Sequence, residues 1–242
     1  MRPKLLIIGH LDATGRHGIA AGMRAAETLG VEPLPVVTAY ALGGDTPDAM
    51  RPVRGNIIAR QLAMALERAP EAALIGTVTR PRHARMIGQQ ITLAGPSATV
   101  LAPMPSAFDI APLVSARLFP AICRFLIPEA RAVVLAARNA PVLLGKGGQD
   151  LDGSRAVGRQ LLDMGAGCAW IRAIPNEARH IDIFVDQNGP GLLDYQLARE
   201  NAEPHTAAAS LAALLALGTK MREAIGRAHR HAYGLDRNLH PV

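Results

Sequence analysis

The chain has 242 residues, a formal net charge of +6, 49% hydrophobic residues and only 3% aromatic residues. This hydrophobic content excludes a disordered chain, and two cysteines are too few for a disulfide framework. The length favours one large α/β domain, which buries roughly 70% of its surface without disulfides or metals. Cys123 and Cys168 fit a reducing compartment or ordinary core packing, so we expect a cytoplasmic protein.

Membrane and nucleic-acid classes are both disfavoured. The most apolar stretch, residues 206–218, is too short to span a bilayer, and the apolar run near the N-terminus lacks a cleavage pattern. The positive charge is almost entirely arginine, and its densest run, "RPRHAR" at 80–85, contains no aromatic residue. We interpret that run as a solvated helix start, with a phosphate-binding patch as the alternative. A nucleic-acid-binding protein stays a minor alternative.

The predicted elements follow one another as alternating strands and helices. Residues 4–10 form a continuous apolar run that predicts a strand buried on both faces, and residues 19–30 have helical spacing closed by Gly30. The same patterns then predict strand 33–42, helix 56–70, strand 72–78, helix 82–95, strand 98–105, helix 111–130 with an interruption at Pro120, strand 132–138, helix 154–166, strand 168–174, an antiparallel edge hairpin over 180–189, and helices 205–218 and 219–234. This alternation predicts one α/β domain over residues 1–242 with a mostly parallel sheet.

In such a sheet, ligands bind at the carboxyl ends of the strands. The candidate loops are 9–18, 40–46, 76–79, 102–106 and 136–139, together with the helix entry at His205. The first loop lacks the G-x-G-x-x-G spacing of dinucleotide-binding proteins. The "GKGGQ" run at Lys146 lacks the Ser/Thr of a phosphate-binding P-loop, so we interpret it as a surface turn.

The order of several segments resembles a known family. The opening "GHLDATGRHGIAAGMRAAETLGVEPLPVVTAY" is similar to that of the hydroxymethylpyrimidine and phosphomethylpyrimidine kinases, which are members of the ribokinase-like superfamily. "ALIGTV", "VLAPMP", "EARAVVLAARNAPVLLG" and "HTAAASLAALLALGTKMREAI" resemble later family segments in the same order. The resemblance implies a three-layer α/β/α sandwich, a small heterocyclic ligand such as a pyrimidine, and a homodimer.

The resemblance also implies site residues. The substrate-binding positions are Gly9, Asp12, Gly43, Thr77 and Met104, the nucleotide-binding positions are Asn139 and Thr206, and His205 is the catalytic candidate, with no metal ligand assigned. His205 lies where the family has the Cys or Asp that activates the substrate hydroxyl, and imidazole titrates near neutral pH. If the activity is retained, ATP and Mg²⁺ are the cofactors; otherwise no cofactor is implied.

Departures from the family pattern fall on further positions that are functional in the family. The family's glycine-rich anion hole corresponds to Ala202, Glu203 and Pro204. Pro204 has no N–H to donate, and a carboxylate at 4 Å from a phosphate oxygen is repelled by roughly 4 kcal/mol at an effective dielectric of 20. Ala102 replaces a family Asp and Leu74 a family Lys. These changes predict a protein whose phosphoryl transfer is lost or altered; the alternative is an active kinase that uses His205 as base.

Two further clusters of polar residues lie near the C-terminus. His229 and His231 are two residues apart in a predicted helix, so they point to different faces, and we expect solvent exposure over metal binding. Asp182 and Asp186 share one face of an alternating strand, with Asp194 nearby. We expect an exposed edge hairpin there, with a cation or substrate site as the alternative.

Overall fold

The computed structural model describes residues 1–42, 50–103, 117–145, 150–176, 179–195 and 204–233. Among them, nine strands form a single sheet in the order β3-β2-β1-β4-β5-β6-β7-β8-β9. The strands are β1 (Lys4–Asp12), β2 (Glu32–Ala41), β3 (Met50–Pro52), β4 (Ala72–Ile75), β5 (Ala98–Leu101), β6 (Ala132–Ala136), β7 (Ala169–Asn176), β8 (Arg179–Asp186) and β9 (Gly189–Tyr195). Strands β1, β2, β4, β5, β6 and β7 are parallel to one another, whereas β3, β8 and β9 pair antiparallel with their neighbours. The predicted α/β class with a mostly parallel sheet is confirmed.

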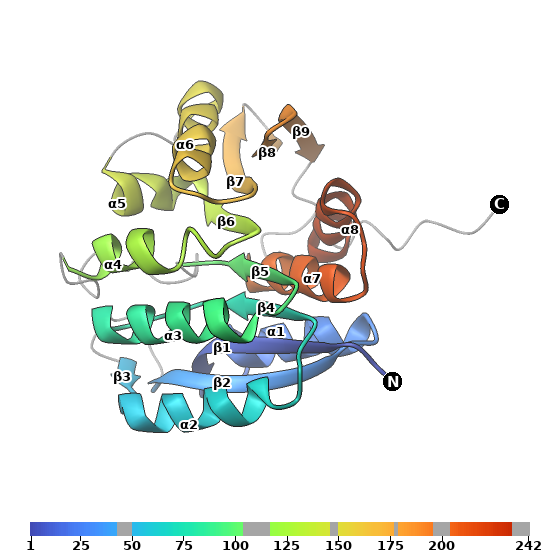
Figure 1. The fold of residues 1–242 in the computed structure, drawn as a ribbon. Helices are drawn as coiled ribbons and strands as arrows, with labels where there is room; N and C mark the ends of the chain where they lie inside the picture. Colours follow the sequence, from blue (N-terminus) through green and yellow to red (C-terminus); the bar gives the residue numbers. More distant parts are fainter. Residues whose placement is uncertain (43–49, 104–116, 146–149, 177–178, 196–203, 234–242) are drawn as a thin grey trace.

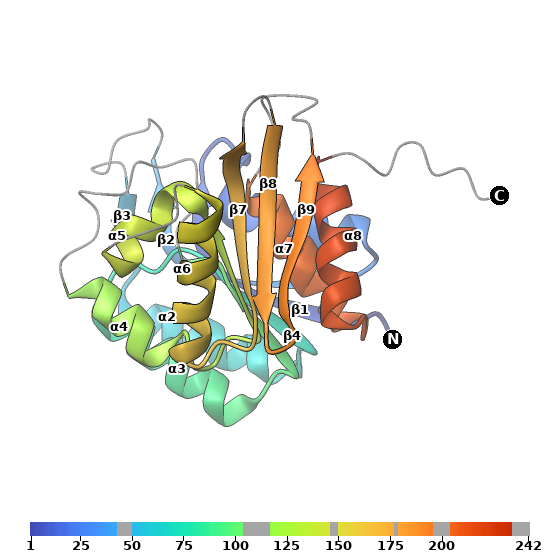
Figure 2. The ribbon, with the colours of Figure 1, turned by 90° about the horizontal axis from the view of Figure 1, so that it is seen from above.

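The helices cover both faces of this sheet, which gives three layers (Figures 1 and 2). In the described part of the chain they are α1 (Gly18–Thr28), α2 (Gly55–Leu66), α3 (Pro81–Ala94), α4 (Leu118–Phe125), α5 (Ala140–Leu144), α6 (Leu151–Asp163), α7 (Pro204–Ala216) and α8 (Met221–Tyr233), with a 3₁₀ turn at Ala137–Asn139. Helices α2 to α6 pack on one face, and α1, α7 and α8 pack on the other. The predicted α/β/α sandwich is therefore confirmed.

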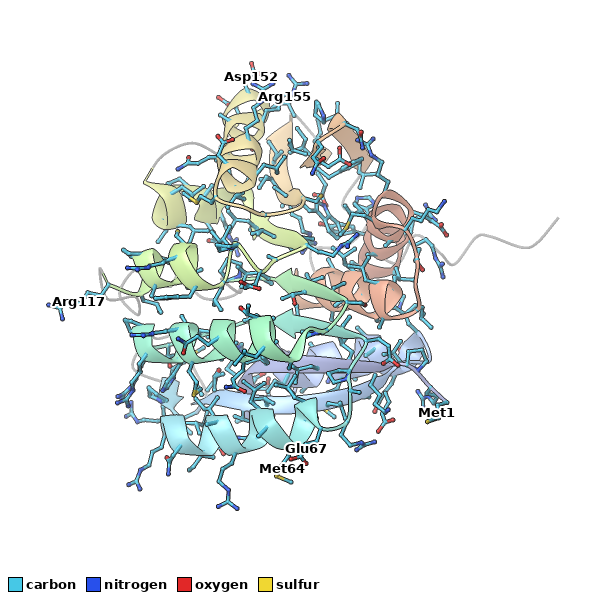
Figure 3. All side chains as sticks on the ribbon, in the orientation of Figure 1. Met1, Met64, Glu67, Arg117, Asp152 and Arg155 are labelled. Atoms are coloured by element: carbon cyan, nitrogen blue, oxygen red, sulfur yellow. The ribbon has the colours of Figure 1, made fainter. Side chains whose placement is uncertain are left out.

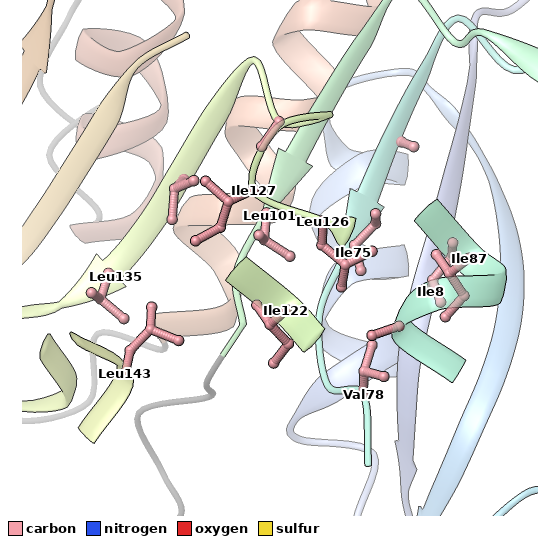
Figure 4. Close-up of a cluster of buried hydrophobic side chains, with 14 of the residues drawn as sticks. Ile8, Ile75, Val78, Ile87, Leu101, Ile122, Leu126, Ile127, Leu135 and Leu143 are labelled. Atoms are coloured by element: carbon pink, nitrogen blue, oxygen red, sulfur yellow. The ribbon is translucent and has the colours of Figure 1, made fainter. Parts of the chain in front are cut away.

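Two separate cores hold the layers together. In the first, side chains of the central strands interdigitate with those of α3, α4 and α5 (Figure 4). Its labelled members are Ile8, Ile75, Val78, Ile87, Leu101, Ile122, Leu126, Ile127, Leu135 and Leu143. In the second core, the alanine-rich α7 is buried along residues 207–216 and packs against α1, β4 and β5. A helix apolar on every side belongs in the interior, and small side chains let α7 approach the sheet closely.

Helix ends and surface positions follow local rules. Gly30 has the left-handed φ of +79° that closes α1, as predicted. On the outer face, Met64 of α2, Glu67 directly after α2, and Asp152 and Arg155 of α6 point to solvent (Figure 3). None of the helices in the described ranges has the length and apolar content needed to cross a bilayer.

One local prediction was wrong, and two short elements were not predicted. Pro120 does not interrupt a helix, because α4 begins only two residues earlier and the missing N–H of Pro120 falls in its first turn, where no intrahelical partner exists. The short β3 and α5 were not predicted, since neither is long enough to show a period in the sequence. The antiparallel edge hairpin predicted at 180–189 is confirmed, but it extends further, over β8 and β9 to Tyr195, and β9 is its outermost strand.

Candidate functional site

The sheet changes its winding direction between β1 and β4. From β1 the chain moves to β2 on one side, and from β4 it moves to β5 on the other. The connecting helices lie on opposite faces there, because α1 covers one face and α3 the other. Such a switch point leaves a crevice at the carboxyl ends of the two strands, where α/β proteins bind ligands. Gly9, Asp12 and Thr77, three of the predicted substrate-binding residues, lie at this point.

A chain of polar contacts joins three strands at the switch point. His10 Nδ1 lies 2.9 Å from Thr77 Oγ1, and the Thr38 hydroxyl donates to the Thr77 carbonyl at 2.6 Å. His10 and Thr38 are completely buried, and Thr77 is 8% exposed. Gly9 belongs to the same group, because a Cβ on it would lie 3.8 Å from the Thr77 amide nitrogen. The strand ends thus present a histidine and a threonine that act as one hydrogen-bonded unit.

His10 is neutral at physiological pH. Burial lowers its pKa from 6.5 to about 4, with the Asp12 charge opposing this change and His17 adding to it. A neutral imidazole offers one donor and one acceptor, so His10 hydrogen-bonds without bringing a positive charge to the site. The sequence analysis did not single out His10, although a polar residue at the end of a continuous apolar strand was the available signal.

Asp12 organises the loop that leads into α1. Its carboxylate accepts the backbone N–H groups of Thr14, Arg16 and His17, at 3.1 to 3.2 Å, and also the Thr14 hydroxyl. Burial alone raises the pKa of Asp12, but the hydrogen bonds from Thr14, His17 and Arg16 outweigh it, and the net pKa lies below the usual 3.8. Most of the acceptor capacity of this carboxylate is therefore used by its own loop.

Gly18 closes this loop against His10. Its φ is +58°, a left-handed conformation that side chains other than glycine rarely adopt. A Cβ at this position would collide with the His10 carbonyl oxygen and lie 2.8 Å from His10 Nε2. Glycine is thus required for two independent reasons, and the start of α1 is held directly against the imidazole.

The predicted nucleotide-binding residues lie further along the same edge. Asn139 follows β6 in the 3₁₀ turn; it is 8% exposed, and its Nδ2 is buried without a hydrogen-bond partner among the described residues. Thr206 lies in the first turn of α7, which packs against β4 and β5. The side chain of His205, and Gly43 and Met104 altogether, lie outside the described residues.

A serine and a histidine connect α7 to α8 next to Thr206. The Ser210 hydroxyl donates to the Thr206 carbonyl at 2.6 Å and contacts His231 Nδ1 at 2.7 Å. Because the single hydroxyl proton goes to Thr206, His231 Nδ1 must be the donor in the second contact. This contact fixes the tautomer of His231 and leaves Nε2 as an acceptor when the ring is neutral.

The C-terminal acidic and histidine residues form a buried network, contrary to the predicted exposure. Asp182 is completely buried and accepts from Trp170 Nε1 at 3.0 Å and from the Ala173 amide at 2.8 Å. His229 is 4% exposed, and its Nε2 lies 4.0 Å from the Asp182 carboxylate. The prediction failed because α8 covers this face of the sheet, which the alternation within one strand does not reveal.

An arginine completes this network at the carboxyl edge. Arg172 is 5% exposed, lies 3.7 Å from Asp182 and donates to the Tyr233 hydroxyl at 2.6 Å. In the sheet register it pairs with Ala136, the last residue of β6. Asp186, by contrast, forms an ion pair with Arg222 at 2.6 Å on the other edge. The described residues contain no group of three potential metal ligands.

Solved structures define the class of fold. Pyridoxal kinase from Staphylococcus aureus, in complex with pyridoxal, has a TM-score of 0.86 at 20% identity, covering 98% of this chain and 89% of that chain. Pyridoxal kinase from Bacillus subtilis, in an ADP complex, gives 0.85 at 19%, covering 95% and 90%. Phosphomethylpyrimidine kinase from Clostridium difficile gives 0.77 at 22%, covering 93% and 96%. The fold is that of the ribokinase-like vitamin kinases.

The sequence identifies the family within that class. Residues 12–238 match the phosphomethylpyrimidine kinase family, and the chain belongs to it. No curated protein matches the chain in sequence. The predicted family is therefore confirmed.

Proposed function

We propose that this protein binds a small heterocyclic ligand at the β1–β4 switch point and that its ATP-dependent phosphoryl transfer is lost or altered. The observation that carries the proposal is the start of α7, which begins at Pro204 directly after Glu203 in the sequence. A helix N-terminus binds phosphate through its free N–H groups and its positive dipole end. A proline removes one of those N–H groups, and an adjacent carboxylate opposes the phosphate charge.

The heterocycle is supported by the groups at the switch point. The neutral, buried His10 hydrogen-bonds Thr77 without adding a positive charge to the switch point, and such an uncharged environment suits an uncharged heterocycle. The similar structures bind pyridoxal or belong to enzymes named for a pyrimidine. We therefore propose a pyrimidine-like or pyridine-like alcohol as ligand, with Gly9, Asp12, Gly43, Thr77 and Met104 on the substrate side.

An active kinase is the alternative. In it, the substrate hydroxyl oxygen attacks the γ-phosphorus of ATP, His205 accepts the hydroxyl proton, and ADP leaves. Bound Mg²⁺ supplies charge neutralisation of the phosphates. The buried Asn139 Nδ2, free of partners in the described residues, and Thr206 at the start of α7 are the groups that would hold the nucleotide. We favour the first proposal because, by the family resemblance, Glu203 and Pro204 occupy the sequence positions of the glycine-rich phosphate-binding loop.

The test uses purified protein with Mg²⁺-ATP and either hydroxymethylpyrimidine or pyridoxal. We expect no phosphorylated product and no ATP-dependent thermal shift, but a shift with at least one heterocycle. The double variant Glu203→Gly/Pro204→Gly restores backbone donors and removes the charge, so ATP binding should increase in it. Phosphorylated product from the unmodified protein, or a micromolar Kd for Mg²⁺-ATP, would overturn the proposed loss and favour the kinase with His205 as base.

We also propose a domain organisation, an oligomeric state and a cellular location for this protein. We propose that residues 1–242 form one ribokinase-like domain, because strands from Lys4 to Tyr195 join a single sheet. A homodimer and a cytoplasmic location follow from the family resemblance, and light scattering on the purified protein tests the dimer. Binding to nucleic acid stays a minor alternative, for which binding with a steep salt dependence would be the signature.

A further inference from the structure

Two helices begin side by side on the face of the sheet opposite α1 and α7. Helix α2 starts at Gly55 and α3 starts at Pro81, and the two helices pack against each other (Figure 1). Their N-cap residues are Arg54 and Arg80; neither side chain caps its helix, and neither first turn contains an acidic residue. Helix N-termini usually carry Ser, Thr, Asp or Glu, because the free N–H groups and the dipole attract negative charge. Here that negative charge is missing from both ends.

A buried histidine lies between the two ends and has no hydrogen-bond partner among the described residues. His83, in the first turn of α3, is 1% exposed, and neither ring nitrogen has a hydrogen-bond partner in the described part of the chain. Its Nε2 faces the start of α2, because a Cβ on Gly55 would lie 3.6 Å from it. The Thr79 hydroxyl, one residue before the N-cap of α3, is also buried without a partner there. Buried polar groups normally have partners, so these groups are candidates for hydrogen bonds with a ligand at the junction.

The surrounding arginines also have no acidic partner in the described part of the chain. The side chains of Arg54, Arg80 and Arg82 are exposed and form no ion pair or hydrogen bond with any described residue. Elsewhere in the described residues, arginines form ion pairs with acidic side chains: Arg68 contacts Glu32 at 2.7 Å, and Arg222 contacts Asp186 at 2.6 Å. Burial lowers the pKa of His83, and the charges of Arg82 and Arg80 lower it further. Among the described residues, therefore, no acidic side chain compensates the positive charge at this junction.

We propose that the junction of α2 and α3 binds a phosphate group, either inorganic phosphate or the phosphate of a small monoester. A phosphate has several oxygens to share among two helix ends, guanidinium groups and an imidazole, whereas a carboxylate has only two. Gly55 is partly exposed and has no side chain, and a Cβ added to it would lie 3.6 Å from His83 Nε2, so no side chain of this residue lies between the His83 ring and the start of α2. The "RPRHAR" run, expected to be a solvated helix start, thus supplies this site through Arg80, Arg82 and His83.

This site is separate from α7 but structurally connected to the switch point. The Val53 amide, directly before Arg54, donates to the Thr38 carbonyl at 2.9 Å, and Thr38 in turn bonds to Thr77. Thr79 and Arg80 continue the segment that carries Thr77. Phosphate at the junction would therefore contact two segments that also shape the candidate ligand site.

Calorimetric titration of the full chain with inorganic phosphate tests the proposal, with glycerol phosphate as the monoester and sodium chloride at matched ionic strength. We expect saturable binding to the unmodified protein. Arg80→Gln/Arg82→Gln should weaken it at least about tenfold, because charged donors are lost. The matched control is Arg60→Gln, an exposed arginine further along α2, which should leave binding within about twofold.

Gly55→Ala is the sharper variant, since it adds one methyl group where the ligand oxygen would meet His83 Nε2. The 3.6 Å separation is an ordinary contact, so the variant should fold at least as stably as the unmodified protein yet lose phosphate binding. Tighter binding of phosphate than of glycerol phosphate assigns the site to the free ion, and the reverse order assigns it to a monoester. The proposal would be overturned if neither phosphate nor glycerol phosphate bound saturably. It would also be overturned if Arg60→Gln weakened phosphate binding as much as Arg80→Gln/Arg82→Gln, or if Gly55→Ala bound phosphate as well as the unmodified protein.

Discussion

The neutrality of His10 predicts a specific pH dependence of stability. The pKa of His10 is lowered from 6.5 to about 4 in the folded protein, mainly by burial. Below pH 6.5 the unfolded chain therefore binds a proton that the folded chain does not, so stability is fully present above 6.5 and falls as the pH drops toward 4. For this one group, the loss between about pH 8 and about pH 5 is about 2 kcal/mol.

The perturbation that isolates this effect is His10→Gln, which keeps a polar group beside Thr77 but removes the titration. The free energy of unfolding is measured in urea at a series of pH values for both proteins. Burial also lowers the pKa of His83 and His229, but these two groups titrate in both proteins and cancel in the difference. The unmodified protein should lose stability relative to the variant as the pH falls. A difference that stays constant from about pH 8 to about pH 5 would refute the neutral, buried His10.

Three other predictions concern the loop and the buried network. Gly18→Ala should lower the free energy of unfolding, measured with denaturant, by about 2–4 kcal/mol, because it adds left-handed strain and a collision with the His10 carbonyl. The control Gly30→Ala has open space around it and should lower the free energy of unfolding by only about 1 kcal/mol. Equal losses in the two variants would exclude the collision. Asp12→Ala should accelerate amide hydrogen exchange at residues 14–17 at least about tenfold without changing exchange in β1, and uniform acceleration would contradict its local role. Asp182→Ala leaves the buried Arg172 without its carboxylate and should lower the free energy of unfolding by about 3–5 kcal/mol. A decrease of less than about 1 kcal/mol would show that water reaches the charges of this network.

The fold was predictable because its strands are buried on both faces. Runs such as Leu5–Ile8, all 0–2% exposed, leave a continuous apolar signal that needs no tertiary information. The glycines after helices gave further signals, since Gly30 and Gly95 both adopt the left-handed conformation that ends a helix. The family was identified differently, from the resemblance of several sequence segments in the same order, and the match over residues 12–238 confirmed it.

The buried polar residues were much harder to predict. Asp182 and His229 belong to segments with polar periodicity, and each becomes buried only because α8 packs onto β7 and β8 from about fifty residues further along the chain. Thr38 is polar in a strand whose register shifts beside His10, and a single sequence gives no sign of that shift. For Asp12, the pattern identified an important residue, while the structure shows that its carboxylate mainly serves the adjacent loop.

The positive helix ends offer a way to separate the two phosphate-related proposals. Helix α7 begins with a proline after a glutamate, whereas α2 and α3 begin beside arginines that lack acidic partners in the described residues. The two regions lie on opposite faces of the sheet, so a variant in one should not alter ligand binding at the other. Glu203→Gly/Pro204→Gly should therefore increase ATP binding and leave the titration with phosphate unchanged. Arg80→Gln/Arg82→Gln should weaken phosphate binding and leave ATP binding unchanged. If both double variants change both titrations together, one phosphate site serves both ligands, and the proposed separation is wrong.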